Sequence, residues 1–384
     1  MITIILNAIS AKKHAGGAFQ ISQNFLLKAL EDGYIDETVN WYYIVSQDLD
    51  EAIGRHFLSL KETKYFVFPT QPDFRNSYLD VKKKLAELEN NIKPDIIYSI
   101  TAPSYFNFKT KEVMRFTNPW VTHPNIYSWK SYSFVERIKQ MLYCSVQKQM
   151  MKSAYAFVTQ TETTKKGIMR ITGKSSDRVC VVSNVLPKIF QKLDTEPIAD
   201  KEWINIACVG NPVPHKNFDI LPGVILELIK MNITNIRFHT TIPYDSPMID
   251  KIIEPLKKRN LEVHIVNHGR IPQTELGNMY QHCQFCFLPT LLEVFSASTI
   301  EAMYYKLPIV ATDFDFNKEV LNDSCLYYEP MNAQDAAKQL ARLIRNTNLQ
   351  QECRKKMVVL LKKYGDYDAH FNAIKKFLIQ TIEK

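Results

Sequence analysis

The sequence predicts an α/β protein made of two doubly wound domains. Short β-rich runs alternate with longer amphipathic stretches along the chain, and such alternation implies parallel sheets covered by helices on both faces. The pattern restarts near residue 204, after a polar, proline-bearing segment at 186–201. A chain of 384 residues is long enough for two or three domains of about 150 residues each. We therefore predict domains at 1–190 and 200–365, followed by a C-terminal helix at 366–384.

Thirteen short apolar runs are the expected strands. In the first half they are 2–6, 41–45, 65–68, 96–99, 120–122, 156–159 and 179–182. In the second half they are 204–209, 236–240, 263–266, 285–288, 309–312 and 326–328. Helical patterns fill most gaps, for instance 21–30, 224–230 and 275–280. Ligands of such sheets bind beyond the carboxyl ends of the strands, so we expect one central cleft between two facing domains.

Composition excludes several classes of protein. With 46% hydrophobic and 23% charged residues, the chain is typical of a globular protein and not of a disordered or fibrous one. No apolar run approaches the ~20 residues of a membrane span. The first seven residues form a strand pattern without a basic leader, so we expect a cytoplasmic protein. Seven cysteines, mostly in apolar runs, indicate reduced thiols, and we interpret the Cys283–Cys286 pair as structural.

The net charge of +8 allows attraction to an anionic surface, either membrane or nucleic acid. The stretch 133–152 combines Arg137, Lys139 and Lys148 with apolar residues such as Met141 and Leu142. It predicts a helix that rests as a peripheral element on the inner face of a membrane. Burial of the same helix in the core stays open as the alternative.

Two glutamates, Glu293 and Glu301, are the most informative pair in the chain. Glu293 follows the expected strand 285–288, and Glu301 lies in the opening turns of a helix. A helix start offers free N–H groups and about half a positive charge, which suits a phosphate. Two carboxylates beside it would hold the hydroxyls of a nucleotide-sugar. For Glu301 a capping box with Ser298 is the alternative, but that interpretation leaves Glu293 unexplained.

Further candidates lie where expected strands end. The doublet Gly16–Gly17 lets backbone approach a phosphate or sugar closely, although an ordinary turn explains it too. Lys216 follows the strand 204–209 and would neutralise a diphosphate, an attraction of roughly 4 kcal/mol at ~4 Å. His123 follows the run 120–122 and is either structural or catalytic, and a glycine-led loop at Gly269 would hold a base.

Two D-x-D motifs, at Asp48–Asp50 and Asp313–Asp315, have no companion ligands nearby in the sequence. We therefore expect neither a metal site nor a cofactor.

The block around the glutamates reads Glu293-Val-Phe-Ser-Ala-Ser-Thr-Ile-Glu301-Ala-Met, followed by Leu307-Pro-Ile-Val-Ala-Thr-Asp313. It resembles the retaining glycosyltransferases of family 4, in which two glutamates are separated by seven residues. The resemblance is strongest over 208–329 and is weaker but colinear over 1–190. Thr159-Gln-Thr-Glu162 and Val181-Val-Ser-Asn184 match there as well. It implies the GT-B fold, with the C-terminal helix returning to the first domain.

The resemblance also implies roles for individual residues. Glu301 would bind the nucleotide ribose, Glu293 the donor sugar and Lys216 the diphosphate, and His123 matches a histidine near that sugar. The implied catalytic residues are therefore His123, Lys216 and Glu293. Asn211 stands where the family usually has an arginine, so Arg270 is the candidate for a second positive charge. The whole implied donor site comprises Gly16, Gly17, Asn211, Lys216, Gly269, Arg270, Ile271, Glu293, Phe295, Ser296, Ser298, Thr299 and Glu301.

The function that the resemblance implies is a retaining, metal-independent glycosyltransferase with a nucleotide-diphosphate sugar donor. The acceptor would be a saccharide or a lipid-linked saccharide in cell-surface polysaccharide or glycoconjugate synthesis, and nucleic acid is not an expected partner. Two alternatives stay open: a GT-B nucleotide-sugar epimerase, and a non-catalytic protein that binds nucleotide-sugars or nucleic acid.

Overall fold

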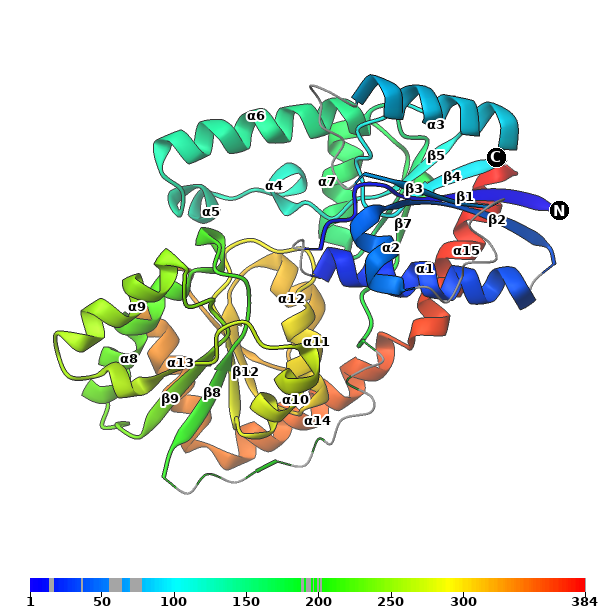
Figure 1. The fold of residues 1–384 in the computed structure, drawn as a ribbon. Coiled ribbons are helices and arrows are strands. Elements are labelled where there is room, and N and C mark those ends of the chain that lie inside the picture. Colours follow the sequence, from blue (N-terminus) through cyan, green and yellow to red (C-terminus); the bar gives the residue numbers. More distant parts are fainter. Residues whose placement is uncertain are drawn as a thin grey trace. The chain divides into compact units, whose positions relative to one another are not determined.

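The computed structural model describes the chain except residues 14–16, 36, 55–63, 70–77, 188–189, 191–194, 196, 199, 201 and 384. Gly16 and most of the predicted linker at 186–201 thus lie outside the described residues. The chain divides into two compact units. Unit 1 comprises Met1–Thr122, Met141–Val182 and Asp368–Lys384, and unit 2 comprises His123–Gln140 and Ser183–Tyr367. Each unit contains one parallel sheet with helices around it (Figure 1), so the predicted α/β class with two Rossmann-like domains is confirmed.

Unit 1 has a seven-stranded parallel sheet of order β3-β2-β1-β4-β5-β6-β7. Alternate residues of β1 face opposite cores, with Ile4 and Leu6 in one and Ile5 in the other. Both faces of the sheet are therefore buried, as parallel sheets require. The strands are β1 (Ile2–Ala8), β2 (Val39–Ser46), β3 (Tyr65–Phe68), β4 (Ile96–Ser99), β5 (Glu112–Arg115), β6 (Ala156–Thr159) and β7 (Val179–Val181).

The helices of unit 1 include the last helix of the chain, α15, whose buried side chains Phe371, Ile374 and Leu378 belong to the same core as β1. Helix α6 (Phe134–Met151) begins in residues assigned to unit 2 and ends in unit 1. The others are α1 (Gly17–Ile35), α2 (Gln47–Ile53), α3 (Tyr78–Ile92), α4 (Pro119–Thr122), α7 (Glu162–Thr172) and α15 (Tyr367–Ile382), with a 3₁₀ turn at Ser176–Arg178.

One predicted strand is wrong. Residues 120–122 form the short helix α4, because Pro119 fixes a helical start and the Asn118 carbonyl accepts from the N–H groups of Val121 and Thr122. The strand of this region is β5, which the prediction missed. Its four residues begin and end with a charged side chain, so the run is too short and too polar to show a strand pattern.

Unit 2 has a six-stranded parallel sheet of order β10-β9-β8-β11-β12-β13. Counted from its first strand this is the order 3-2-1-4-5-6, in which the direction of winding reverses between β8 and β11. The strands are β8 (Ile204–Cys208), β9 (Ile236–Thr240), β10 (Ile265–Asn267), β11 (Phe285–Leu288), β12 (Ile309–Thr312) and β13 (Leu326–Tyr328).

The helices of unit 2 surround this sheet (Figure 1), with α13 packed against α8 and α14 packed against α11 and α13. They are α5 (Ile126–Lys130), α8 (Leu221–Lys230), α9 (Pro247–Lys257), α10 (Gln273–Gln281), α11 (Ala297–Tyr304), α12 (Asp315–Leu321), α13 (Ala333–Arg345) and α14 (Thr347–Lys363). Short 3₁₀ turns lie at Pro214–Lys216, Phe218–Ile220 and Glu262–His264. All seven cysteines are free thiols, and Cys283 and Cys286 are buried in the core of this unit.

Within unit 1, a buried ion pair fixes α15 to α1. The Lys375 ammonium lies 2.7 and 2.8 Å from the two carboxylate oxygens of Asp32, which also accepts from the Trp41 indole at 2.9 Å. The exposed fractions of the two charged side chains are only 11% and 14%. Removing one member of such a pair leaves the other charge buried without its partner, which costs about 3 kcal/mol or more.

We therefore predict that Lys375→Met lowers the free energy of unfolding by about 3 kcal/mol in urea titrations. The neighbouring Lys376 is exposed on the same helix, so Lys376→Met is the matched control and stays within about 0.5 kcal/mol of the wild type. Equal stability of the two variants would contradict the anchoring role of Lys375.

Candidate functional site

A small pocket in unit 2 lies at the carboxyl ends of β8 and β11, where the winding of the sheet reverses. This is the position at which open α/β sheets bind ligands. Four of the residues predicted for the donor site line it, namely Lys216, Ser296, Ser298 and Thr299. The other lining residues are Val209, Phe218, Leu288, Pro289 and Thr290.

The N-terminus of α11 forms one wall of the pocket. Ser296 is the N-cap residue, but its side chain does not cap the helix. Its hydroxyl lies instead 2.9 Å from the hydroxyl of Ser298. Both hydroxyls and the positive end of the helix dipole therefore lie at the same wall of the pocket, a combination that suits an anion such as a phosphate.

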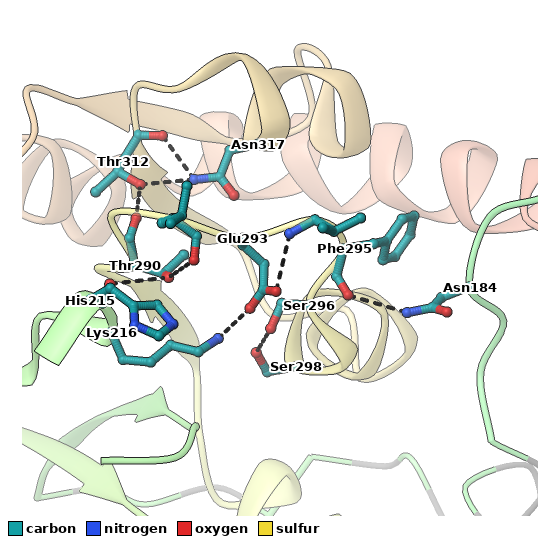
Figure 2. Close-up of polar contacts among 12 residues, drawn as sticks. Asn184, His215, Lys216, Thr290, Glu293, Phe295, Ser296, Ser298, Thr312 and Asn317 are labelled. Carbon is teal, nitrogen blue, oxygen red and sulfur yellow. Dashed lines mark hydrogen bonds and ion pairs between the residues drawn. The ribbon is translucent and has the colours of Figure 1, made fainter. Parts of the chain in front are cut away.

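Lys216 and Glu293 form an ion pair beside this helix end (Figure 2). The Lys216 Nζ lies 2.5 Å from the Glu293 Oε2, and Glu293 Oε1 accepts from the backbone N–H of Val294 at 3.1 Å. The exposed fractions of the two side chains are 15% and 22%. Burial by itself raises the pKa of Glu293, but the charge and hydrogen bond of Lys216 outweigh it, and the pKa lies below its ordinary value.

The backbone of residues 289–296, called here the Glu293 loop, is held by side chains from distant segments. The Pro289 carbonyl accepts from Asn217 Nδ2 at 3.2 Å, and the Leu291 carbonyl accepts from Asn125 Nδ2 at 2.7 Å. At the far end the Phe295 carbonyl accepts from Asn184 Nδ2 at 3.2 Å.

Two further carbonyls of the Glu293 loop are held in the same way. The Thr290 carbonyl accepts from the hydroxyl of Thr312 at 2.6 Å, and Asn317 Nδ2 donates to both the carbonyl and the hydroxyl oxygen of Thr312 (Figure 2). The Glu293 carbonyl lies 2.8 Å from His123 Nε2. A carbonyl only accepts, so His123 carries its proton on Nε2 and orients the backbone of Glu293.

His215 links the loops that follow β8 and β11. Its carbonyl accepts from the Leu291 backbone N–H at 2.7 Å, and its ring stacks on Tyr132 with ring centres 6.4 Å apart. Burial first, and then the charge of Lys216, lower the pKa of His215 to about 4. The imidazole is therefore neutral near pH 7 and adds no positive charge beside Lys216.

Glu301 is buried, 3% exposed, and accepts from the Tyr280 hydroxyl at 2.9 Å. The capping-box alternative is wrong, because α11 begins at Ala297 and the third helical position is Thr299, two residues before Glu301. Burial raises the pKa of Glu301 to about 7, although the Tyr280 hydrogen bond acts in the opposite direction. Its carboxyl group is therefore partly protonated at neutral pH.

The remaining predicted residues lie elsewhere. Gly17 is the exposed first residue of α1, in unit 1. Asn211 is exposed after β8, and Gly269, Arg270 and Ile271 follow β10, which is separated from β8 by β9. None of these residues lines the pocket. Gly269 has φ +68°, and a Cβ there would lie 2.5 Å from the Tyr244 ring, so glycine is required.

The acidic motifs have local partners. Asp313 pairs with Lys318 at 2.5 Å, and Asp48 accepts from the backbone N–H of Lys13 at 2.8 Å. Within the part of the chain that the structure describes, no three His, Cys, Asp or Glu side chains gather closely enough to hold a metal ion.

Among the residues that hold the Glu293 loop, the sequence singled out His123 but not Asn125 or Asn217, because a side-chain amide on a distant carbonyl leaves no local pattern. The only sequence signal at Asn217 is that it directly follows Lys216. In the structure it adopts φ +57°, a conformation that asparagine tolerates better than most residues. Asn184 closes one of the matched family motifs.

These features define an α/β protein with two Rossmann-like units, the second of which carries a phosphate-compatible pocket. Residues 191–357 match the family model described as "Glycosyl transferases group 1". An uncharacterized glycosyltransferase of Methanocaldococcus jannaschii is 30% identical over 143 residues. That match covers 37% of this chain and 38% of the archaeal protein.

Solved structures share the fold over the whole chain. A glycosyltransferase from Rickettsia africae has a TM-score of 0.69 at 15% identity, covering 100% of this chain and 99% of its own. HepE of Anabaena, solved with UDP-glucose, has a TM-score of 0.69 at 13% identity, covering 99% and 100%. The lipopolysaccharide outer core galactosyltransferase WaaB has a TM-score of 0.65 at 15% identity, covering 99% of both chains.

The ion pair leads to a prediction about stability and pH. In Lys216→Met, only burial still acts strongly on Glu293, so its pKa rises above the ordinary 4.5. A carboxyl group whose pKa is raised in the folded state destabilises the protein increasingly as the pH rises above the pKa that the group has in the unfolded state. We expect a loss of about 3 kcal/mol near pH 7 that shrinks toward pH 4, measured by urea unfolding.

The double variant Lys216→Met/Glu293→Gln removes the unpaired charge and is the control. It recovers most of the lost stability and its pH dependence. A double variant that is less stable than Lys216→Met alone would show that the two residues do not act as a pair.

Proposed function

We propose that this protein is a nucleotide-sugar-dependent glycosyltransferase whose donor binds to unit 2. The observation that carries the proposal is the pocket between β8 and β11. There a helix N-terminus, two serine hydroxyls and Lys216 converge beside the carboxylate of Glu293. The first three groups suit a diphosphate, and the carboxylate suits the hydroxyls of a sugar. The group 1 family match over 191–357 and the GT-B fold support this assignment.

In the proposed donor complex, Lys216 and the N-terminus of α11 hold the diphosphate. Glu293 accepts hydrogen bonds from the donor sugar, and Glu301 accepts from the ribose. His123 acts near the sugar through the orientation of the Glu293 backbone, which it contacts at 2.8 Å. Gly269, Arg270 and Ile271 hold the base, and Arg270 supplies a second positive charge.

The proposed reaction breaks the bond between the anomeric carbon of the sugar and a diphosphate oxygen. A new bond forms to an acceptor hydroxyl oxygen on the same face, so the configuration is retained. The departing diphosphate takes the proton of that hydroxyl. Lys216 and the helix start stabilise the negative charge that develops on the leaving group, so no step requires a metal ion or cofactor.

We infer an acceptor that is a saccharide or a lipid-linked saccharide, in the synthesis of cell-surface polysaccharide or glycoconjugate. The fold shared with a lipopolysaccharide outer core galactosyltransferase supports this class of acceptor. The site of action is the cytoplasm and the inner face of the membrane.

A first experiment identifies the nucleotide and tests the catalytic role of Lys216. Thermal shift with UDP, UDP-glucose and other nucleotide-sugars selects the ligand, which at a hundred times its Kd stabilises by about 2.7 kcal/mol. Release of nucleotide diphosphate with and without saccharide acceptors then separates a transferase from an epimerase. Loss of a roughly 4 kcal/mol interaction in Lys216→Ala lowers transfer about a thousandfold.

Glu293→Ala lowers transfer in the same assay. Lys230→Ala is the matched control for Lys216→Ala and keeps the wild-type transfer rate, because Lys230 lies exposed on α8 with 69% of its side chain accessible. Wild-type transfer rates in both folded site variants would contradict the proposed site.

A second experiment tests the ribose role of Glu301. The pKa of its carboxyl group is about 7, and ribose hydroxyls that donate to the carboxylate favour the charged form. Nucleotide binding then lowers this pKa and releases a proton near pH 7. We expect the affinity for UDP-glucose, whose esterified diphosphate does not titrate in this range, to rise as the pH increases from 6 to 8, with proton release in calorimetry across buffers of different ionisation enthalpy.

Glu301→Gln cannot titrate, so in this variant the rise in affinity and the proton release both disappear. A wild-type affinity for UDP-glucose that is independent of pH, or proton uptake on binding, would exclude the proposed ribose contact.

A further inference from the structure

Helix α6 carries an apolar surface that solvent reaches. The helix has 18 residues, of which only Cys144, Gln147 and Met151 are buried. A rise of 1.5 Å per residue gives it a length of about 27 Å. Its exposed large hydrophobic residues, with exposed fractions from 40% to 75%, are Phe134, Val135, Ile138, Met141, Leu142, Tyr143 and Val146.

Most of these side chains lie on one side of the helix. Successive residues are about 100° apart, which places Phe134, Ile138 and Met141 on one line and Leu142, Val135 and Val146 beside it. The three buried residues lie on the opposite side by the same rotation. The apolar stripe therefore points away from the protein, so the core alternative raised by the sequence is wrong for these residues. An exposed apolar patch of this kind marks a surface for another partner.

Basic residues flank the stripe. Lys139 lies along one edge and Lys148 along the other. Arg137 lies nearer the buried side, where its Nε donates to the Tyr132 carbonyl at 2.9 Å, and the single acidic residue of the helix, Glu136, projects from the far side. Lys139 and Lys148 are exposed. An apolar stripe between two basic edges matches the acyl and phosphate layers of an anionic membrane surface.

We propose that the stripe of α6 (Phe134, Val135, Ile138, Met141, Leu142 and Val146) binds flat to the surface of a membrane that contains anionic lipids. The apolar side chains enter the boundary between head groups and acyl chains, and the exposed Lys139 and Lys148 contact lipid phosphates. Within the described residues no helix is long and apolar enough to cross a bilayer, so the contact is interfacial. This inference rests on the proposed function in one respect: a lipid-linked acceptor would lie at a membrane.

Charge favours a lipid surface over a protein as the occupant of this face. A protein interface has a core depleted of charge and a rim matched to one partner, whereas here both edges of the stripe carry positive charge. The chain as a whole adds to this attraction, with a net charge of +8. Each Lys or Arg near an anionic surface strengthens binding about fivefold.

The test is co-sedimentation of the full chain with phosphatidylcholine vesicles, with or without one third phosphatidylglycerol. We expect binding to the anionic vesicles that weakens with salt. The apolar variant Met141→Gln/Leu142→Gln keeps good helix formers and lowers the partition coefficient at least about tenfold. The charge variant Lys139→Gln/Lys148→Gln lowers it about thirtyfold.

Matched controls lie on helices of other regions. Val359 is 72% exposed on α14, and the Lys83 side chain is 78% exposed on α3, so Val359→Gln and Lys83→Gln leave vesicle binding unchanged. Equal losses in these controls, or equal binding by the α6 variants and the wild type, would overturn the inference. So would a wild-type dimer in light scattering that the apolar variant turns into a monomer, because a second copy would then cover the stripe.

Thermal shift with UDP is measured on every variant. Unchanged UDP binding with no vesicle binding contradicts the membrane inference and leaves the proposed function intact. Vesicle binding without a response to any nucleotide or nucleotide-sugar contradicts the proposed function and leaves the membrane inference intact.

Discussion

The ion pair between Lys216 and Glu293 is the interaction on which the candidate site depends. It joins the segments that follow β8 and β11, the two strands between which the winding of the sheet reverses. Either charge alone in this largely buried position would be strongly destabilising. The two segments must therefore fold together, and the backbone link from His215 to Leu291 fixes their spacing. The position of the pocket follows from this constraint.

The fixed Glu293 loop explains how a single carboxylate is positioned without a regular secondary structure around it. Five of its carbonyls accept from the side chains of residues 123, 125, 184, 217 and 312. Several of these donors are buried, and a buried donor whose partner moved away would lose about 1–3 kcal/mol. The loop is consequently held in one conformation, and the electrostatic groups of the site are preorganised in the sense that transfer chemistry requires.

Hydrophobic patterning predicts most of this fold because buried parallel strands are short continuous apolar runs. It fails at β5, where Glu112 and Arg115 end a four-residue strand, and at α4, where Asn118 and Pro119 impose a helix on apolar residues. Local spacing also brought forward Glu293 and Lys216 separately, each after an expected strand, and the structure joins the two in an ion pair. For Glu301 it left a capping box open as the alternative, and only the observed start of α11 shows that this box is out of register. Contacts from asparagine side chains to distant carbonyls depend on tertiary structure alone.

The way in which the Glu293 loop is fixed also bears on evolution. Its tethers reach main-chain carbonyls, which every amino acid provides, and not the side chains that the loop presents to the pocket. Substitutions at pocket-facing positions such as Ser296 therefore leave the tethers in place. Related proteins can therefore come to recognise different donor sugars while the backbone of the Glu293 loop stays the same. The asparagines, in contrast, are expected to tolerate little change, although none of them lines the pocket.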